Sequence, residues 1–314
     1  GDSERLDTTL SDLGEAVQVI IKTPILLKYA IKRNQVKCMQ VLIERGASIT
    51  ELSDGSKNAL HYAACYGNTD VVERLIKQYP QLMTAKDTSG CMPIHYAASH
   101  GHTDVVEQLI KQDPQFMTAK DTSGSMPIHY AASHGHTDVV EQLIKQDPQF
   151  MTAKDTSGCM PIHYAASHGH TDVVEQLIKQ DPQLMTVKDT SGCMPIHYAA
   201  SHGHTDVVEQ LIKQDPQLMT AKDTSGCMPI HYAASHGHTD VVEQLIKRYP
   251  QLMTAKDTSG CMPLHYAAHY GHTDVVEQLI KQDPQLMTAK DTSGCMPIHY
   301  AAHYGHTDVV EQLI

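Results

Sequence analysis

The segment DTSGCMPIHYAASHGHTDVVEQLI, residues 87–110, is the main indication of the fold because it returns almost unchanged along the chain. Units 189–222 and 223–256 differ only at Gln214/Arg248 and Asp215/Tyr249. A histidine recurs at intervals of 34 residues, as His61, His95, His129, His163, His197, His231, His265 and His299. Self-similarity at a fixed period predicts a stacked repeat array.

The first half of the unit predicts a turn and a short helix. Asp87–Gly90 has the Asp and Gly of a type I turn. Pro93 suits the first turn of a helix, where its missing N–H costs nothing. Ile94 and the two alanines at 97–98 give one apolar stripe. Gly101 then ends the helix, since glycine tolerates a left-handed conformation.

The second half predicts another helix. Thr103 is a favourable N-cap, and the segment 105–110 carries the apolar face Val, Val, Leu and Ile. Pro114 ends the helix, and Asp113 as N-cap with Pro114 as N1 predicts an extra helical turn. Such short helices are marginal alone, so we expect each pair to bury its apolar stripes against neighbouring pairs.

These motifs resemble the ankyrin repeat, a unit of about 33 residues with a TPLHxA signature. The matching segments are MPIHYAA (92–98), GH (101–102), DVVEQLI (104–110) and the DxxG turn (87–90). The resemblance implies an all-α solenoid of stacked helix-turn-helix units with short β-hairpin-like turns, in a curved superhelix. Methionine replaces the signature threonine at Met92 and its equivalents, which leaves the usual Thr–His hydrogen bond open.

The repeats predict the domain organisation. Residues 1–22 are expected to form an N-terminal capping segment, and residues 23–314 an array of about nine units whose last one is incomplete. The last unit lacks a polar capping repeat, so we expect either further chain or stacking of this end, including end-to-end self-association. The units begin near Thr23, Ser53, Asp87, Asp121, Asp155, Asp189, Asp223, Asp257 and Asp291.

Composition narrows the partner classes. The formal charge of −12 argues against nucleic acid and anionic membranes, because phosphate binding needs a basic face. The eight cysteines are expected to be free thiols, because equivalent positions in neighbouring repeats lie too far apart for disulfides. A reducing compartment follows: the cytoplasm or another intracellular location, or the host cytosol if the chain is a secreted effector.

Two patterns that contain histidine suggest a metal site or a catalytic site. Equivalent histidines of neighbouring repeats are about 8–10 Å apart, too far for one zinc ion, so no metal site is expected. Cys91 and His95 lie four residues apart, but a nucleophile needs an orienting group and a single pocket. We therefore expect no catalytic residue and no cofactor. With 22 histidines, a pH switch remains an alternative, which a stability curve from pH 5 to 8 tests.

The resemblance implies that the turn tips and first helices line a groove that binds protein partners. Tyr66, Tyr270 and Tyr304 replace the variable histidine in the end units, and tyrosine is enriched at binding hot spots. We expect the sharpest contacts there. The predicted partner-binding residues are Tyr66, Ser89, Cys91, Ser99, His100, Ser125, His134, Cys159, His168, Cys193, His202, Cys227, His236, Cys261, His269, Tyr270, Cys295, His303 and Tyr304.

The leading hypothesis is a non-catalytic, intracellular protein–protein interaction scaffold. One alternative is the recruiting arm of a larger enzyme, channel or bacterial effector, which a catalytic or membrane segment elsewhere in the gene would indicate. Another is a structural spacer or self-assembling array, which light scattering over a concentration series would detect. The uniform central units suit a repetitive partner or a spacer.

Overall fold

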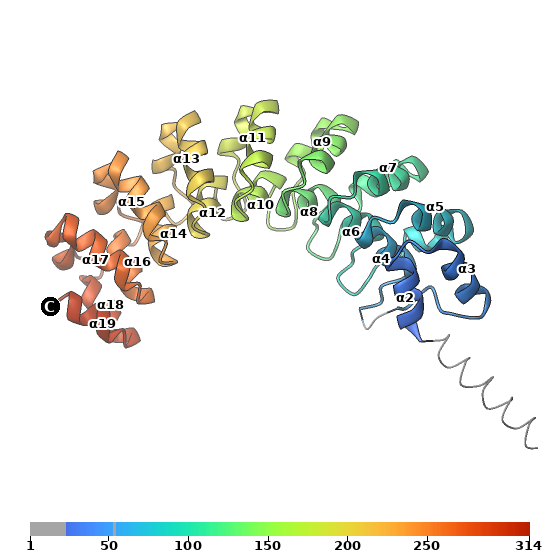
Figure 1. Ribbon diagram of the computed structural model, residues 1–314. Coiled ribbons are helices and arrows are strands. Elements are labelled where there is room, and N and C mark those ends of the chain that lie inside the picture. Colours follow the sequence, from blue (N-terminus) through green and yellow to red (C-terminus); the bar gives the residue numbers. More distant parts are fainter. Residues whose placement is uncertain (1–22, 53–54) are drawn as a thin grey trace, which may run out of the picture. The chain divides into compact units, whose positions relative to one another are not determined.

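The computed structural model describes residues 23–52 and 55–314. The capping segment predicted for residues 1–22 lies outside the described residues. The chain divides into two compact units, Gly1–Phe150 and Met151–Ile314, called unit 1 and unit 2 below. Each is a stack of helix pairs (Figure 1), and neither described range contains a β-strand.

In unit 1, the first helix of each pair joins an inner row and the second joins an outer row (Figure 1). Helices of the inner row pack side by side, each against the next. The inner row is α2 (Pro24–Lys32), α4 (Ala59–Tyr66), α6 (Pro93–Ser99) and α8 (Pro127–Ser133). The outer row is α3 (Val36–Glu44), α5 (Thr69–Gln78), α7 (Thr103–Gln112) and α9 (Thr137–Gln146).

Unit 2 repeats this arrangement, so the predicted stacking of helix pairs is confirmed. Its inner row is α10 (Pro161–Ser167), α12 (Pro195–Ser201), α14 (Pro229–Ser235), α16 (Pro263–Tyr270) and α18 (Pro297–Tyr304). Its outer row is α11 (Thr171–Gln180), α13 (Thr205–Gln214), α15 (Thr239–Arg248), α17 (Thr273–Gln282) and α19 (Thr307–Gln312).

The local signals act where the sequence places them, with one exception. Gly90 N–H donates to the Asp87 carbonyl over 2.9 Å, which closes the predicted turn. Pro93 is the first residue of α6, and Gly101 has a left-handed φ of 73°. Thr103 is not the N-cap of α7. His102 takes that place and its carbonyl accepts the N–H of Val106, so Thr103 already lies inside the helix.

The extra turn that follows the outer helices from α5 to α17 is a 3₁₀ helix. Asp113 caps it by accepting the N–H of Gln115 over 2.9 Å, and Pro114 is its first residue, as predicted. These helices are η1 (Pro80–Met83), η2 (Pro114–Thr118), η3 (Pro148–Thr152), η4 (Pro182–Thr186), η5 (Pro216–Thr220), η6 (Pro250–Thr254) and η7 (Pro284–Thr288).

The periodic histidine ties the two ends of its own repeat together, and His61 Nε2, which lies 3.0 Å from the Cys91 carbonyl, also reaches the next repeat. His95 Nδ1 accepts the backbone N–H of Met92 over 3.0 Å, so its proton resides on Nε2, which donates to the Ala119 carbonyl over 3.0 Å. The methionine that replaces the signature threonine therefore binds the histidine through its backbone. In the second repeat, Asn58 supplies a side-chain cap as well, because its Oδ1 accepts the N–H of His61.

The histidine of the Gly-His pair fastens a repeat to the one before it. His136 Nε2 lies 2.9 Å from the Ser99 carbonyl, to which it donates. The ring also covers Gly101, where a Cβ would lie 2.5 Å from His136 Nδ1. Glycine is therefore required here both by its left-handed φ and by the ring of the next repeat.

Candidate partner-binding site

The inner face of each unit consists of the DTSG turns and the outward side of the inner-row helices. Its recurring element is a hydrogen-bonded chain that crosses two repeats. Tyr232 donates its hydroxyl proton to Asp223 Oδ2 over 2.7 Å, and Cys193 Sγ of the preceding repeat lies 3.1 Å from the same hydroxyl. The same triple recurs as Cys91–Tyr130–Asp121, Cys159–Tyr198–Asp189, Cys227–Tyr266–Asp257 and Cys261–Tyr300–Asp291.

Burial keeps the thiols of these triples protonated. Burial raises the pKa of Cys159 and of Cys227 to about 11, although each tyrosine hydrogen bond lowers it in part. Burial and the hydrogen bond to Asp223 raise the pKa of the Tyr232 phenol. The hydrogen bond from Tyr300 is the main cause that holds the pKa of the Asp291 carboxyl below its usual value. These thiols are therefore poor nucleophiles at neutral pH.

The side chains at the cysteine position of the repeat are more deeply buried than the sequence suggests. Five of the predicted contact residues are buried, with exposed fractions of 4–7%, and offer almost no surface to a partner. The reason is that each side chain fills the space between its own turn and the tyrosine of the next repeat. The five are Cys91, Ser125, Cys159, Cys193 and Cys227, whereas Cys261 and Cys295 are half-buried.

The other predicted contact residues do reach the surface. Tyr66, Tyr270 and Tyr304 are 37%, 53% and 51% exposed, which is high for large apolar side chains. The half-buried residues are Ser99 and His269, and the exposed ones are Ser89, His100, His134, His168, His202, His236 and His303.

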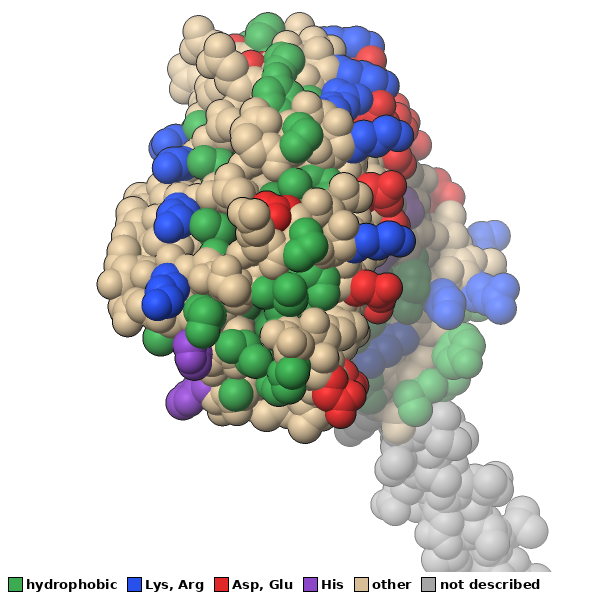
Figure 2. Space-filling model, turned by 90° about the vertical axis from the view of Figure 1, so that its left-hand side faces the viewer, with side chains coloured by type: hydrophobic (Ala, Val, Ile, Leu, Met, Phe, Trp, Pro, Cys, Tyr) green, Lys and Arg blue, Asp and Glu red, His purple; other side chains and the backbone are tan. Residues whose placement is uncertain are grey.

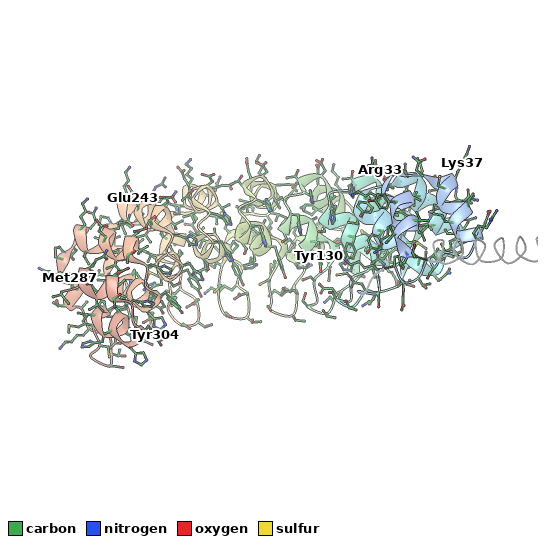
Figure 3. The ribbon with its side chains drawn as sticks, turned by 60° about the horizontal axis from the view of Figure 1, so that its bottom comes forward. Arg33, Lys37, Tyr130, Glu243, Met287 and Tyr304 are labelled. Atoms are coloured by element: carbon green, nitrogen blue, oxygen red, sulfur yellow. The ribbon has the colours of Figure 1, made fainter. Side chains whose placement is uncertain are left out.

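Aromatic rings gather on α16 and α18 of unit 2. The centroid of the His269 ring lies 4.1 Å from that of Tyr304, 4.4 Å from that of Tyr270 and 5.8 Å from that of Tyr300. In Figure 3, Tyr304 points to the side of unit 2 opposite Glu243, which lies on the outer-row helix α15. The inner face thus carries the aromatic surface and the outer row a charged one.

Two neighbouring pockets open on this aromatic surface. One has a volume of about 220 Å³, and the pocket one repeat earlier has about 260 Å³; Tyr266 and Tyr270 line both. Neither lining includes a lysine or an arginine. The larger is lined by Asp223, Ser225, Cys227, His231, Tyr232, Ser235, His236, Tyr266 and Tyr270, the smaller by Asp257, Ser259, Cys261, His265, Tyr266, His269, Tyr270 and Tyr300.

A comparison with models of protein families shows to which family the chain is related. The family model described as ankyrin repeats (three copies) matches residues 27–121, 60–155, 94–187, 162–257 and 249–314. The chain belongs to the ankyrin-repeat family. Ankyrin repeats are generally protein–protein interaction modules, and their fold is typically non-catalytic. A search of curated proteins found no match.

The ankyrin array places its cysteine and histidine side chains in structural contacts. Both ring nitrogens of His95 bind backbone groups, and Cys91 Sγ lies 3.1 Å from the hydroxyl of Tyr130. Within residues 23–52 and 55–314, no three His, Cys, Asp or Glu side chains are grouped so as to hold a metal ion. The helices in these ranges are too short or too polar to cross a membrane.

Sequence reasoning missed one set of contacts on the inner face of the ankyrin array. The ammonium of Lys57 lies over the ring of Tyr96, 4.6 Å from its centroid, and Lys28 lies in the same way over Tyr62 at 4.9 Å. Lys57 precedes His61 by four residues, as Cys91 precedes His95. This replacement of cysteine by lysine is the signal that could have revealed the contact.

Proposed function

We propose that this ankyrin array is a non-catalytic interaction scaffold that binds protein partners through its inner face. The single observation that carries the proposal is the aromatic surface of α16 and α18, where Tyr270 and Tyr304 are half exposed beside two pockets. Exposed tyrosine beside a pocket is the composition of an interaction hot spot. Tyr66 on α4 supplies a separate contact in unit 1.

Changing Tyr66, Tyr270 and Tyr304 together to alanine tests this function. The three side chains are exposed, so we expect the variant to keep its helical circular dichroism while partner recovery in a pull-down falls about tenfold or more. A matched control changes the exposed outer-row residues Glu107 and Glu277 to alanine and keeps full recovery. Equal recovery by the tyrosine variant and the control would contradict the proposal.

The cellular location and the class of partner follow as further proposals. All eight cysteines are free thiols, which supports an intracellular, reducing compartment. The protein partner then meets the array there, without nucleic acid, membrane or cofactor. The alternative of a recruiting arm within a larger enzyme, channel or effector uses the same inner face, so the pull-down tests both.

Self-association is a second candidate, favoured by the end of unit 2. Figure 2 views this end, where hydrophobic side chains gather along the middle of the face. We expect light scattering to show a mass that rises with protein concentration. A constant monomer mass would leave the scaffold function standing and remove this candidate.

A further inference from the structure

A lysine ammonium of the chain itself lies over one tyrosine ring of the inner face. Lys57 extends from the second repeat and places its ammonium 4.6 Å from the ring centroid of Tyr96 in the third. Tyr96 at the same time donates its hydroxyl proton to Asp87 Oδ2 over 2.5 Å. The cation therefore meets an electron-rich ring that is hydrogen-bonded to a carboxylate, a combination that attracts positive charge.

The tyrosines of unit 2 keep the ring and the carboxylate but have no such cation. Tyr232, Tyr266 and Tyr300 each donate to an aspartate over 2.7 Å. Among the described residues, no lysine or arginine lies over these rings, and cysteines stand where Lys57 stands in the second repeat. The space beside the rings forms the two pockets of about 260 and 220 Å³.

We propose that the two pockets of unit 2 bind arginine side chains of a basic partner segment, in the place that Lys57 takes at Tyr96. This inference rests on the proposed function of the inner face. Arginine fits because its planar guanidinium stacks on tyrosine and donates hydrogen bonds to carboxylates, here those of Asp223 and Asp257. The formal charge of −12 complements such a partner.

The spacing of the pockets sets the spacing of the arginines. The pockets belong to consecutive repeats and share Tyr266 and Tyr270. Helices packed side by side lie about 8–10 Å apart, and an extended or polyproline II chain rises about 3.1–3.4 Å per residue. An extended segment with arginine at every third residue therefore places successive guanidinium groups in successive pockets.

Labelled peptides test the ligand class directly. One peptide carries two arginines three residues apart, a second has the same composition with the arginines adjacent, and a third has glutamates in place of the arginines. At about 0.15 M ionic strength, fluorescence anisotropy of the full chain is expected to give about tenfold tighter binding for the first peptide than for either of the others. Equal binding of the glutamate peptide would overturn the inference.

Substitutions that imitate the second repeat test the location. In Cys261→Lys, the new ammonium is expected to occupy the face of Tyr300 as Lys57 occupies that of Tyr96, and to weaken binding of the first peptide about tenfold. Cys261→Met adds side-chain volume to the same pocket without adding charge, so it should weaken binding less than Cys261→Lys does. Identical affinity of these two variants would overturn the proposal.

The reverse change supplies a second test in case Cys261→Lys folds poorly. Lys57→Met vacates the face of Tyr96 and is expected to add a binding site in unit 1, seen as a higher stoichiometry for the arginine peptide. An unchanged stoichiometry would contradict the inference. Failure of every peptide to bind would also overturn it, while tyrosine-dependent recovery of a partner in the pull-down would leave the proposed function intact.

Discussion

Cys193 Sγ lies 3.1 Å from the hydroxyl of Tyr232, which belongs to the next repeat. The tyrosine has a single hydroxyl proton and gives it to Asp223 over 2.7 Å. Its oxygen therefore accepts the proton of the thiol, so one tyrosine links a side chain of its own turn to a side chain of the preceding repeat. The stack of repeats is held by this polar contact as well as by apolar packing.

Removal of one hydroxyl tests how much this contact stabilises the array. Tyr232→Phe leaves the Asp223 carboxylate and the Cys193 thiol without their shared partner, so we expect a loss of about 1–2 kcal/mol in the free energy of unfolding, measured with urea. Tyr304→Phe is the matched control, because this side chain is 51% exposed and should change stability by less than about 0.5 kcal/mol. Equal losses of stability in the two variants would show that the hydrogen bonds of Tyr232 contribute nothing to the stability of the array.

The same contacts predict unequal reactivity of the thiols. Cys38 is exposed, whereas Cys159 and Cys227 are buried and burial raises the pKa of each to about 11. Since the thiolate is the reactive species, iodoacetamide at neutral pH should label Cys38 well before the other two. Peptide mass spectrometry after short exposures checks the order, and simultaneous labelling of all three would refute it.

Acid should weaken the fold before the carboxylates titrate. Burial lowers the pKa of His163, His197 and His231 below 6.5, despite hydrogen bonds that raise it in part. The unfolded chain thus binds more protons than the folded chain as the pH falls below about 6.5, and stability declines in that direction. The urea midpoint should be lower at pH 5 than at pH 7.5. A midpoint that is equal or higher at pH 5 would contradict this sign.

A second acid transition belongs to the turn aspartates. Although burial of Asp121 acts the other way, hydrogen bonds from Tyr130, Ser123 and backbone amides bring its carboxyl pKa below 3.8. Its contribution is present above that value and is lost as the pH falls through the lowered pKa. Asp121→Asn should therefore flatten the pH dependence of stability below about pH 4, measured as thermal midpoints. An unchanged slope would remove this assignment.

Two glycines with the same φ allow the cost of backbone strain to be measured apart from the cost of a steric clash. Gly271 and Gly305 both have φ of 76°, but a Cβ on Gly271 would lie 2.6 Å from His306 Nδ1, whereas one on Gly305 meets nothing within 4 Å. Both alanine variants bear the left-handed strain, of about 1 kcal/mol. We expect Gly271→Ala to lose about 1 kcal/mol more in urea unfolding, because the His306 ring must move. Equal losses would exclude that contact.

Most of the fold could be predicted because its local signals repeat. Pro93 and Gly101 act through backbone geometry and Asp113 through its side-chain cap to Gln115, all within a few residues, which sequence reveals directly. The N-cap was misplaced by one residue, since His102 rather than Thr103 holds it. The preference for threonine at the N-cap predicts the first residue of a helix only where no other contact sets it. Here the hydrogen bond of His102 to the preceding repeat sets the start of the helix.

The site was harder to predict because burial depends on contacts between repeats. Cys91 lies on a turn, which suggested exposure, yet Tyr130 from the next repeat covers it. The exposed Tyr270 and Tyr304 were predictable because they depart from an otherwise uniform position. The ammonium of Lys57 over Tyr96 joins residues 39 positions apart, and the signal for this pair in the sequence is a lysine where later repeats carry cysteine or serine.

Site-specific photo-crosslinking shows whether partners bind the inner face or the outer row. A photoreactive phenylalanine at position 270 on α16 probes the inner face, and one at the exposed position 277 on α17 probes the outer row. With the partner recovered by the array, we expect covalent adducts from position 270 and none above background from position 277. Adducts from position 277 alone, or equal yields from both positions, would contradict it.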